Sequence, residues 1–260
     1  MDIRLDGRAA LITGGSKGLG LATAVRFAEA GATVAIVARN AETLEAAKAA
    51  ITRAARAPVA AFPCDVTDPA AIERAYGSVV SAIGKVDILV NNAGTSQTGK
   101  FADITDATWQ ADLDLKLFAA IRFSRLALPQ MRARRWGRII NVLATAAKAP
   151  RAESAPTSVS RAAGMALTKV LAGECAPNNV LVNALLVGRI VSDQIARRHR
   201  ASGTNVALAA YIREQGTGIP LGRMGEAEEF ANLACFLASD AAAYVTGTAI
   251  NIDGGLSPVV

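Results

Sequence analysis

The stretch Thr13-Gly14-Gly15-Ser16-Lys17-Gly18-Leu19-Gly20 follows the apolar run Ala9–Ile12 and leads into a helical pattern over residues 18–30. Glycines at this spacing let the backbone turn tightly and let a phosphate group approach it closely. The free amides and the dipole at the start of the helix then favour an anion. The glycine pattern alone is weak, because ordinary tight turns also use glycine. Between a strand and a helix, it predicts the phosphate-binding loop of a dinucleotide site.

The second predicted strand ends without the acidic residue that usually holds the adenosine ribose of NAD. Arg39 follows this strand, and Arg39 and Lys17 are both positioned to meet a phosphate on that ribose. A charge-assisted contact from each cation would strengthen binding of the phosphorylated cofactor. We therefore expect NADP(H) to be preferred over NAD(H). The alternative is that both cations are simply solvated.

Apolar runs alternate with helical patterns along the rest of the chain. Strands are predicted over residues 8–13, 33–38, 58–63, 87–90, 138–142, 180–186 and 248–252. Helices are predicted over residues 18–30, 41–54, 69–83, 109–134, 157–176 and 226–238. This alternation favours an α/β fold, a single doubly wound Rossmann-type domain with a parallel, seven-stranded sheet. Asp65 and Asn91–Gly94 follow the third and fourth strands, at the carboxyl edge where such sheets bind ligands, although either segment alone is also typical of an ordinary loop.

Length and composition narrow the class of protein further. A chain of 260 residues suits one domain spanning residues 1–260. Cys64, Cys175 and Cys235 are widely spaced and odd in number, so we expect reduced thiols, no disulfide framework and no metal site. No apolar h-region follows Met1, and no apolar run reaches the roughly 18–20 residues of a membrane span. We therefore expect a cytoplasmic protein without membrane contact.

The net charge of +6 raises the question of nucleic acid, but the basic residues are scattered and only Arg197–Arg200 forms a tight cluster. We interpret that cluster as a solvated helix face, which makes nucleic-acid binding unfavoured while leaving a modest attraction for small anions. Over about residues 188–220 the pattern loosens into short, polar, basic helical pieces. A connection of this length is typical of a lid or binding loop.

These segments together resemble the short-chain dehydrogenase/reductase family over nearly the whole chain. The family's phosphate loop TGxxxGxG is similar to Thr13–Gly20, its NNAG segment to Asn91–Gly94, and its strand ending in GRIIN to Gly137–Asn141. Its RVNxxxPG segment is similar to Leu181–Gly188, and its C-terminal signature begins at Ile219–Arg223. The resemblance implies a nicotinamide cofactor, a small carbonyl or alcohol substrate, and a homotetramer or homodimer.

The resemblance also assigns cofactor-binding roles to positions along the chain. The residues expected to bind the cofactor are Gly14, Ser16, Lys17, Gly18, Leu19, Gly20, Arg39, Asp65, Val66, Asn91, Ala93, Gly94, Arg161, Gly188 and Ile190. Among these, Asp65 is expected to meet the adenine edge and Arg161 the nicotinamide ribose.

The chemistry of the family depends on four side chains that this chain replaces. A Tyr exchanges a proton with the substrate oxygen, a Lys four residues later lowers that Tyr's pKa and holds the ribose, a Ser thirteen residues before the Tyr polarises the substrate, and an Asn supports a water relay. An alignment on Ser160–Gly164, which is similar to the family's SKAG, places Thr157 at the Tyr position and Arg161 at the Lys position. Ala144 then stands at the Ser position and Lys116 at the Asn position.

These replacements change the expected chemistry. A threonine hydroxyl is a far weaker acid than a phenol of pKa ~10, so we expect Thr157 to donate a hydrogen bond at most. Ala144 has no polar group, and Arg161 keeps a charge that it does not lose. Lys116 has two interpretations: it faces the site beside Arg161, with an acidic ligand such as a carboxylate or acyl thioester between the two cations, or it pairs with Asp112 one helical turn earlier.

Other candidate acids are weak. His199 lies in the basic segment, where a surface role is expected, and Tyr211 reaches the nicotinamide only if that segment folds inward. Glu153 and Ser154 precede Thr157 in a loop and are minor candidates.

Three functional hypotheses remain. The first is an NADP(H)-dependent oxidoreductase that transfers hydride between cofactor and a carbonyl or hydroxyl group with a non-standard proton path. The second is a catalytically inactive NADP(H)-binding sensor or structural subunit. A third hypothesis, nucleic-acid binding, rests on charge alone.

Overall fold

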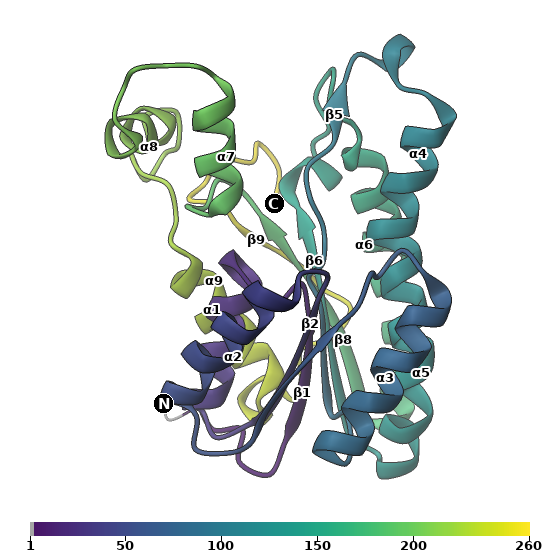
Figure 1. The fold of residues 1–260 in the computed structure, drawn as a ribbon. Coiled ribbons are helices and arrows are strands. Elements are labelled where there is room, and N and C mark those ends of the chain that lie inside the picture. The colour runs from purple at the N-terminus through teal and green to yellow at the C-terminus, as the bar shows by residue number, and fades with distance from the viewer. Residues whose placement is uncertain (1–2) are drawn as a thin grey trace.

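A computed structural model describes residues 3–260 and shows an α/β fold built on one seven-stranded parallel sheet (Figure 1). The strands of this sheet are β1 (Ala9–Thr13), β2 (Thr33–Ala38), β3 (Val59–Pro63), β4 (Ile88–Asn91), β6 (Gly137–Ala144), β8 (Val180–Val187) and β9 (Ala249–Ile252). They lie in the order β3-β2-β1-β4-β6-β8-β9, and every neighbouring pair is parallel. The strand order changes direction between β1 and β4, which creates the topological switch point where such sheets bind ligands. The predicted fold class is confirmed.

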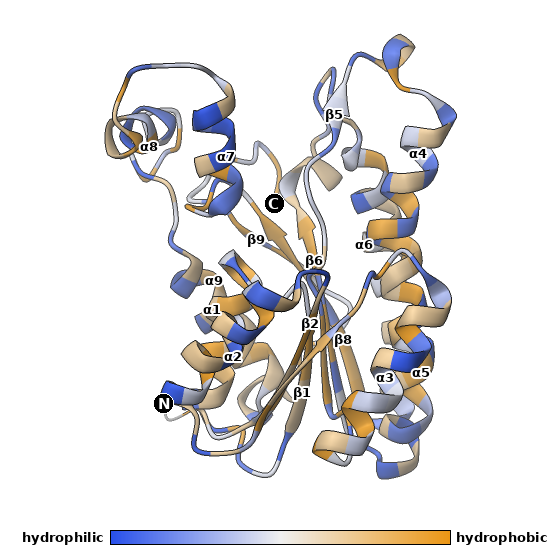
Figure 2. Ribbon diagram, viewed as in Figure 1, coloured by the Kyte–Doolittle hydropathy of each residue, from blue (hydrophilic) through white to orange (hydrophobic). Residues whose placement is uncertain are grey.

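Helices cover both faces of the sheet (Figure 1). One face carries α1 (Gly18–Glu29), α2 (Ala41–Ala54) and α9 (Ala227–Ala238), and the other carries α3 (Pro69–Ile83), α5 (Ala119–Arg134) and α6 (Thr157–Cys175). Figure 2 shows hydrophobic residues along the strands and hydrophilic residues on the outer turns of the helices. Because the helices bury both faces, ligands reach the sheet only at its edges.

The core lies in two layers, one on each side of the sheet. Phe27 and Phe230 are fully buried between α1, α9 and the sheet, and Phe123 and Met131 are fully buried under α5. Residues of the central strands alternate between the two layers, which is why β4 is entirely apolar up to its last residue, Asn91.

Local signals fix several helix ends where the sequence predicts them. Asp68 accepts a hydrogen bond from the amide of Ala70 at 2.9 Å, and Pro69 occupies the first helical position of α3. Gly31 adopts a φ of 98° just after α1, a conformation that side chains other than glycine rarely adopt. α3 begins at its predicted residue, and α1 ends one residue before its predicted end.

The predicted single helix over residues 109–134 is wrong in its bounds and its regularity. The helical run begins earlier with α4 (Asp106–Leu113), because Thr105 caps the amide of Thr108 at 3.2 Å. A π-helical turn over Asp114–Phe118 then separates α4 from α5. Such turns occur often at functional sites, and this one carries Lys116.

Two short strands that the sequence does not predict form a separate antiparallel ladder. β5 (Thr98–Gly99) pairs with β7 (Ala155–Pro156), just before the start of α6. This ladder joins the loop after β4 to the loop after β6, and it therefore fixes the position of Thr157 relative to both.

The segment over about residues 188–220 contains the short helices α7 (Asp193–Ala201) and α8 (Leu208–Gly216), as its polar, basic pattern predicts. Figure 1 shows α7 standing beside the carboxyl edge of the sheet, with α8 farther out. None of the helices formed by residues 3–260 combines the length and apolar character that a membrane span needs.

At the opposite, amino edge of the sheet, Trp136 is the centre of a polar cluster just before β6. The guanidinium carbons of Arg8 and Arg138 lie 3.6 and 4.2 Å from the centre of its ring. Its indole nitrogen donates to Asp240 at 3.0 Å, and Arg138 donates to the same carboxylate at 3.3 Å. The indole and the carboxylate together accommodate the charge of Arg138, which is almost completely buried.

Candidate active site

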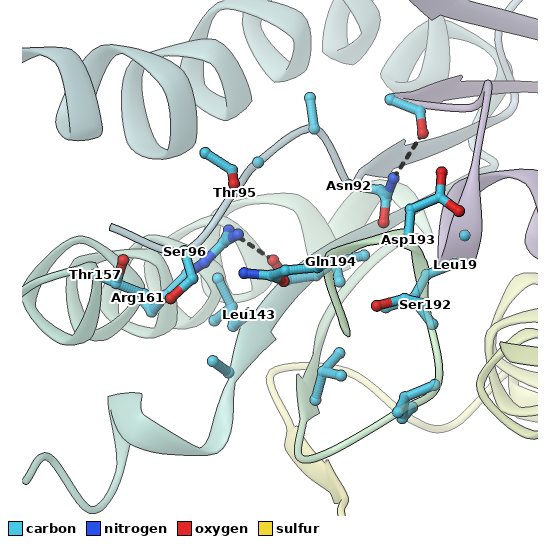
Figure 3. A pocket seen from close by; sticks show the side chains of 18 of the residues that line it. Leu19, Asn92, Thr95, Ser96, Leu143, Thr157, Arg161, Ser192, Asp193 and Gln194 are labelled. Atoms are coloured by element: carbon cyan, nitrogen blue, oxygen red, sulfur yellow. Dashed lines mark hydrogen bonds between the residues drawn. The ribbon is translucent and has the colours of Figure 1, made fainter. Parts of the chain in front are cut away.

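A cavity of about 770 Å³ lies at the carboxyl edge of the sheet, beside the switch point. Its walls come from the phosphate loop, from the loops after β2, β3, β4, β6 and β8, and from α6, α7 and the C-terminal residues. Figure 3 shows Thr157 and Arg161 on one side of this cavity and Leu19, Ser192 and Asp193 on the other. The volume falls in the range of sites that hold cofactors and small ligands.

The phosphate loop has the geometry that its glycines predict. Gly14 has a φ of 64°, and a β-carbon there would lie 2.9 Å from the Cα of Ala93, so a side chain would collide with the loop after β4. Gly18 has a φ of 53°, and a β-carbon there would meet only the Cβ of Ser192, at 3.7 Å. The space in front of Gly18 is therefore open to a ligand.

The start of α1 supplies donors to this space. Lys17 is the N-cap residue of α1, and no side chain caps the first amides of the helix. Uncapped amides and the helix dipole favour an anion at this point. The residues present therefore fit a pyrophosphate group.

Thr13 and Asn92 join the phosphate loop to the loop after β4. The hydroxyl of Thr13 accepts hydrogen bonds from the amides of Asn92 and Ala93, both at 3.0 Å. The side-chain amide of Asn92 donates to the carbonyl oxygens of Thr13 at 2.9 Å and Gly14 at 3.1 Å. These bonds hold the two carboxyl-edge loops in one rigid unit.

Lys17 and Arg39, which follow β1 and β2, both line the cavity, and their binding to a ribose phosphate stays a prediction. Lys17 lies 3.7 Å from Asp193 at the start of α7, with both side chains more than half exposed. An exposed pair of this kind contributes little stability, so Lys17 remains available to a ligand. Asp65 lies nearby, and its pKa is lowered mainly by the hydrogen bond from the amide of Thr67.

At the other end of the cavity, the hydroxyl of Thr157 has no proton to give to a substrate. It donates to the carbonyl oxygen of Gln97 at 2.7 Å. It also accepts from the amide of Gln97 at 2.9 Å and from Lys116 Nζ at 2.7 Å. A hydroxyl has one proton and two lone pairs, and all three are used. Thr157 was expected to donate a hydrogen bond at most, and in the structure that bond goes to Gln97.

Lys116 lies beneath the cavity rather than in its wall. Its side chain is fully buried and pairs with Asp112, whose other carboxylate oxygen accepts from Ser160 Oγ at 2.6 Å. Burial lowers the pKa of Lys116, and the hydrogen bond to Asp112 opposes that shift. Of the two interpretations of Lys116, the structure shows the pair with Asp112. An anionic substrate group between Lys116 and Arg161 is not needed, because Asp112 already supplies the negative charge.

Arg161 lies one turn after Thr157 in α6 and also lines the cavity. Its Nη1 donates to the carbonyl oxygen of Val142 at 2.8 Å, which orients the guanidinium beneath Gly94. Burial lowers the pKa of Arg161 to about 10, so the group stays charged at neutral pH. Ala144 lines the cavity with a methyl group only.

The other candidate acids lie elsewhere. His199 packs 5.2 Å from the ring of Tyr211, and its Nε2 lies 2.7 Å from the carbonyl oxygen of Val206, away from the cavity. Ser154 lines the cavity, but its hydroxyl donates to the carbonyl oxygen of Arg151 at 2.6 Å and lies 3.1 Å from the hydroxyl of Ser158. Glu153 is exposed. Among the described residues of the cavity wall there is no Tyr, His or Glu, and Asp193 is the one carboxylate.

The structure brings most of the predicted site residues together. Those that line the cavity are Gly14, Ser16, Lys17, Gly18, Leu19, Arg39, Val66, Ala93, Gly94, Ala144, Thr157, Arg161, Gly188 and Ile190. Four lie outside its wall: Gly20 packs against the Gly14 carbonyl, Asp65 bonds to Thr67, Asn91 donates to Asn141 at 2.9 Å, and Lys116 is buried as described.

Several lining residues were not predicted. They include Arg151, Arg197, Arg198 and the C-terminal residues Leu256, Ser257 and Pro258. Arg197 and Arg198 are exposed, as predicted for a solvated helix face, yet they also form part of the cavity wall. The sequence signal that could have indicated this placement is the run of consecutive basic residues to which they belong.

Comparison with known proteins gives one consistent result. A family model described as enoyl-(acyl carrier protein) reductase matches residues 14–257. The 3-oxoacyl-[acyl-carrier-protein] reductase of Aquifex aeolicus is 32% identical over 98% of this chain and 100% of its own length.

Two solved structures show the same fold. The L-sorbose reductase of Gluconobacter frateurii, complexed with NADPH and L-sorbose, has a TM-score of 0.95 at 34% identity and covers 100% of both chains. A short-chain oxidoreductase from Pseudomonas aeruginosa PAO1, bound to NADPH and described as containing an atypical catalytic center, has a TM-score of 0.91 at 38% identity and covers 99% of both chains. Together with the sheet order and the glycine loop, these matches show that the chain belongs to the short-chain dehydrogenase/reductase family.

Proposed function

We propose that this protein binds NADP(H) and transfers a hydride between it and a carbonyl or hydroxyl group of a small molecule. One observation carries the proposal: a single cavity joins the phosphate loop to Arg161, across the switch point of the sheet. Both solved relatives described above hold NADPH. The residues that line the cavity include Gly18 and Arg39 as well as Thr157 and Arg161, which supports a dinucleotide with a small substrate beside Arg161.

The residues of the cavity have separate roles in holding the cofactor. The amides at the start of α1 bind the pyrophosphate, Lys17 and Arg39 bind the ribose phosphate, and Arg161 binds the nicotinamide ribose. Bound NADPH supplies the hydride. What the chain adds is orientation, which by itself lowers a barrier by several kcal/mol when reacting atoms are held in contact.

The proton follows a non-standard path in this proposal. Reduction of a carbonyl consumes one hydride and one proton, and the Thr157 hydroxyl has none to spare. Arg161 uses one N–H on Val142 and presents its remaining N–H groups to the cavity. It stabilises the oxygen as negative charge develops there, and water at the cavity mouth supplies the proton. An acidic group on the substrate itself is a second source, which agrees with the basic lining.

Calorimetric titration with NADPH and NADH tests the cofactor assignment. We expect NADPH to bind at least about ten-fold more tightly, which corresponds to one charge-assisted contact of about 1.4 kcal/mol. Lys17→Ala and Arg39→Ala should each weaken NADPH binding and leave NADH binding unchanged. Arg53→Ala, which removes an exposed cation at the far end of α2, is the matched control. Equal affinities for the two cofactors would contradict the assignment.

The saturated hydroxyl of Thr157 also favours a second candidate, an NADP(H)-binding sensor or structural subunit without turnover. A panel of aldehydes, ketones and keto acids, followed through NADPH absorbance, separates the two. Tight NADPH binding without oxidation by any member of the panel would support the second candidate. Oxidation by any carbonyl compound, lost in Arg161→Met, would support the first.

A further inference from the structure

We propose that Arg151, Arg197 and Arg198 form an anion subsite at the mouth of the cavity, which binds a carboxylate or phosphate group on the substrate. The inference rests on the proposed function and names the substrate class. It replaces the earlier expectation of an anion beside Lys116, where Asp112 already lies.

The three arginines belong to two elements that line the same cavity. Arg151 lies in the loop between β6 and β7, after Ala144 and before Thr157. Arg197 and Arg198 lie in α7, which reaches the cavity from the side of β8 and β9. All three line one continuous cavity. A substrate bound beside Arg161 would therefore have basic side chains on more than one side of the cavity.

The charge of these arginines is uncompensated within the described chain. The cations that line the cavity are Lys17, Arg39, Arg151, Arg161, Arg189, Arg197 and Arg198. The one carboxylate in the wall, Asp193, pairs with Lys17. Arg189 donates to the carbonyl oxygen of Gln215 at 2.9 Å and Arg161 to that of Val142. No ion pair is formed by Arg151, Arg197 or Arg198 among residues 3–260.

Like charges that converge on one cavity repel one another unless an anion sits between them. Salt screens this repulsion with a Debye length of about 8 Å at physiological ionic strength, so the effect should weaken as salt is added. A guanidinium group can donate two parallel hydrogen bonds to two oxygens of one carboxylate or phosphate group. Carboxylates and phosphates are therefore both suitable ligands for this subsite.

The cofactor phosphates do not account for these arginines. The phosphate loop and Arg39 lie at the β1–β2 end of the cavity, where Lys17 meets Asp193 at the first residue of α7. Arg197 and Arg198 lie four and five residues farther along α7, roughly 6–8 Å beyond Asp193 at 1.5 Å per residue. Arg151 lies in the loop that leads from β6 to β7 and Thr157. The three arginines are thus placed to meet a substrate rather than the ribose phosphate.

Binding to NADP⁺-saturated protein tests the subsite without turnover and with the cofactor phosphate sites filled. Acetoacetate and methyl acetoacetate form one pair of probes, and dihydroxyacetone phosphate and dihydroxyacetone form the other. The first pair tests a carboxylate and the second a phosphate. Each compound is titrated calorimetrically at low and at physiological salt. We expect the charged member of at least one pair to bind ten-fold or more tightly than its neutral partner, with the advantage falling at higher salt.

Variants locate the effect. Arg151→Gln and the double variant Arg197→Gln/Arg198→Gln should each reduce the preference for the charged probe at least three-fold, while NADP⁺ affinity stays unchanged. Arg200→Gln is the matched control, because Arg200 is an exposed cation of α7 outside the cavity wall. It should leave every affinity unchanged.

Three outcomes would overturn the subsite: equal affinity within both pairs, no binding of either charged probe, or an equal effect of Arg200→Gln. A loss of NADP⁺ affinity in Arg151→Gln that matches the loss of probe affinity would assign the charge to the cofactor instead and overturn it too. Because NADP⁺ binding is measured first, failure of the cofactor assignment shows itself before any probe is added.

Discussion

The buried pair of Lys116 and Asp112 gives the sharpest test of the structure, because it needs no knowledge of the substrate. Their side chains are 0% and 2% exposed. Lys116→Met keeps the length of the side chain and removes its charge. Asp112 then keeps one hydrogen bond, from Ser160, and has no cation in contact. Thr157 loses one donor at the same time.

Removing one partner of a buried ion pair typically costs about 3–5 kcal/mol, because the other charge stays buried without compensation. A domain has a total stability of about 5–15 kcal/mol, so this loss is a large fraction. Replacing both partners, in Asp112→Leu/Lys116→Met, removes both charges from the interior. The double variant should therefore lose at least about 2 kcal/mol less than the sum of the two single variants.

Urea unfolding followed by circular dichroism, at one fixed protomer concentration, measures these values. Arg74→Met is the matched control, because Arg74 pairs with Asp68 at 3.8 Å with both side chains more than half exposed. Its cost should stay below about 1 kcal/mol. The reasoning is refuted if Lys116→Met costs no more than this control, or if the single costs add up in the double variant.

Three further predictions follow from other contacts. Thr157→Val leaves the partners of the hydroxyl unsatisfied and should lower the free energy of unfolding, measured in urea, by about 1–3 kcal/mol. NADPH oxidation should persist in this variant. Loss of oxidation in a folded variant would show that the hydroxyl does act on the substrate. Gly14→Ala should lower the free energy of unfolding by about 1–2 kcal/mol from its φ of 64° alone, and it should weaken NADPH binding. Gly77→Ala, inside α3 with open space around it, is the control and should leave stability unchanged or raise it. The pKa of Glu229 is lowered to about 2, mainly by Arg223, from an ordinary value of 4.5, so this contact stabilises the fold above that value and is lost as pH falls through about 2. The thermal midpoint of wild type should exceed that of Glu229→Gln at pH 7 and match it near pH 2, and a difference that persists in acid would contradict the assignment.

The part of the cavity beside the phosphate loop can be located from the sequence because its determinants are local. The turn at Gly14, the uncapped start of α1 and the missing acid before Arg39 all lie within one strand–helix–strand unit. Periodicity alone locates the strands, and the carboxyl-edge rule then brings Asn92 and Gly94 to the same place.

The substrate end could not be predicted in the same way, because its determinants are distant in sequence. The Thr157 hydroxyl donates its one proton in a hydrogen bond to the carbonyl oxygen of Gln97, which lies 60 residues earlier in the chain. The ladder of β5 and β7 holds Gln97 in this position. That ladder involves two residues on each side and leaves no periodic signal. The position of Lys116 depends on a π-helical turn, whose extra residue rotates the side chains that follow. Arg151 lines the cavity because of the path of the loop between β6 and β7, and a loop has no periodic pattern.

The polar cluster around Trp136 has an optical consequence. The chain has two tryptophans, Trp109 in α4 and Trp136 at the amino edge of the sheet, across the sheet from the ligand cavity. Trp136 touches Arg8 and Arg138 and bonds to Asp240, which come from the beginning, middle and end of the chain. Its emission therefore depends on all three segments being assembled. In a Trp109→Phe background, the indole becomes an intrinsic fluorophore that reports the integrity of the whole sheet and is not itself part of the cavity wall.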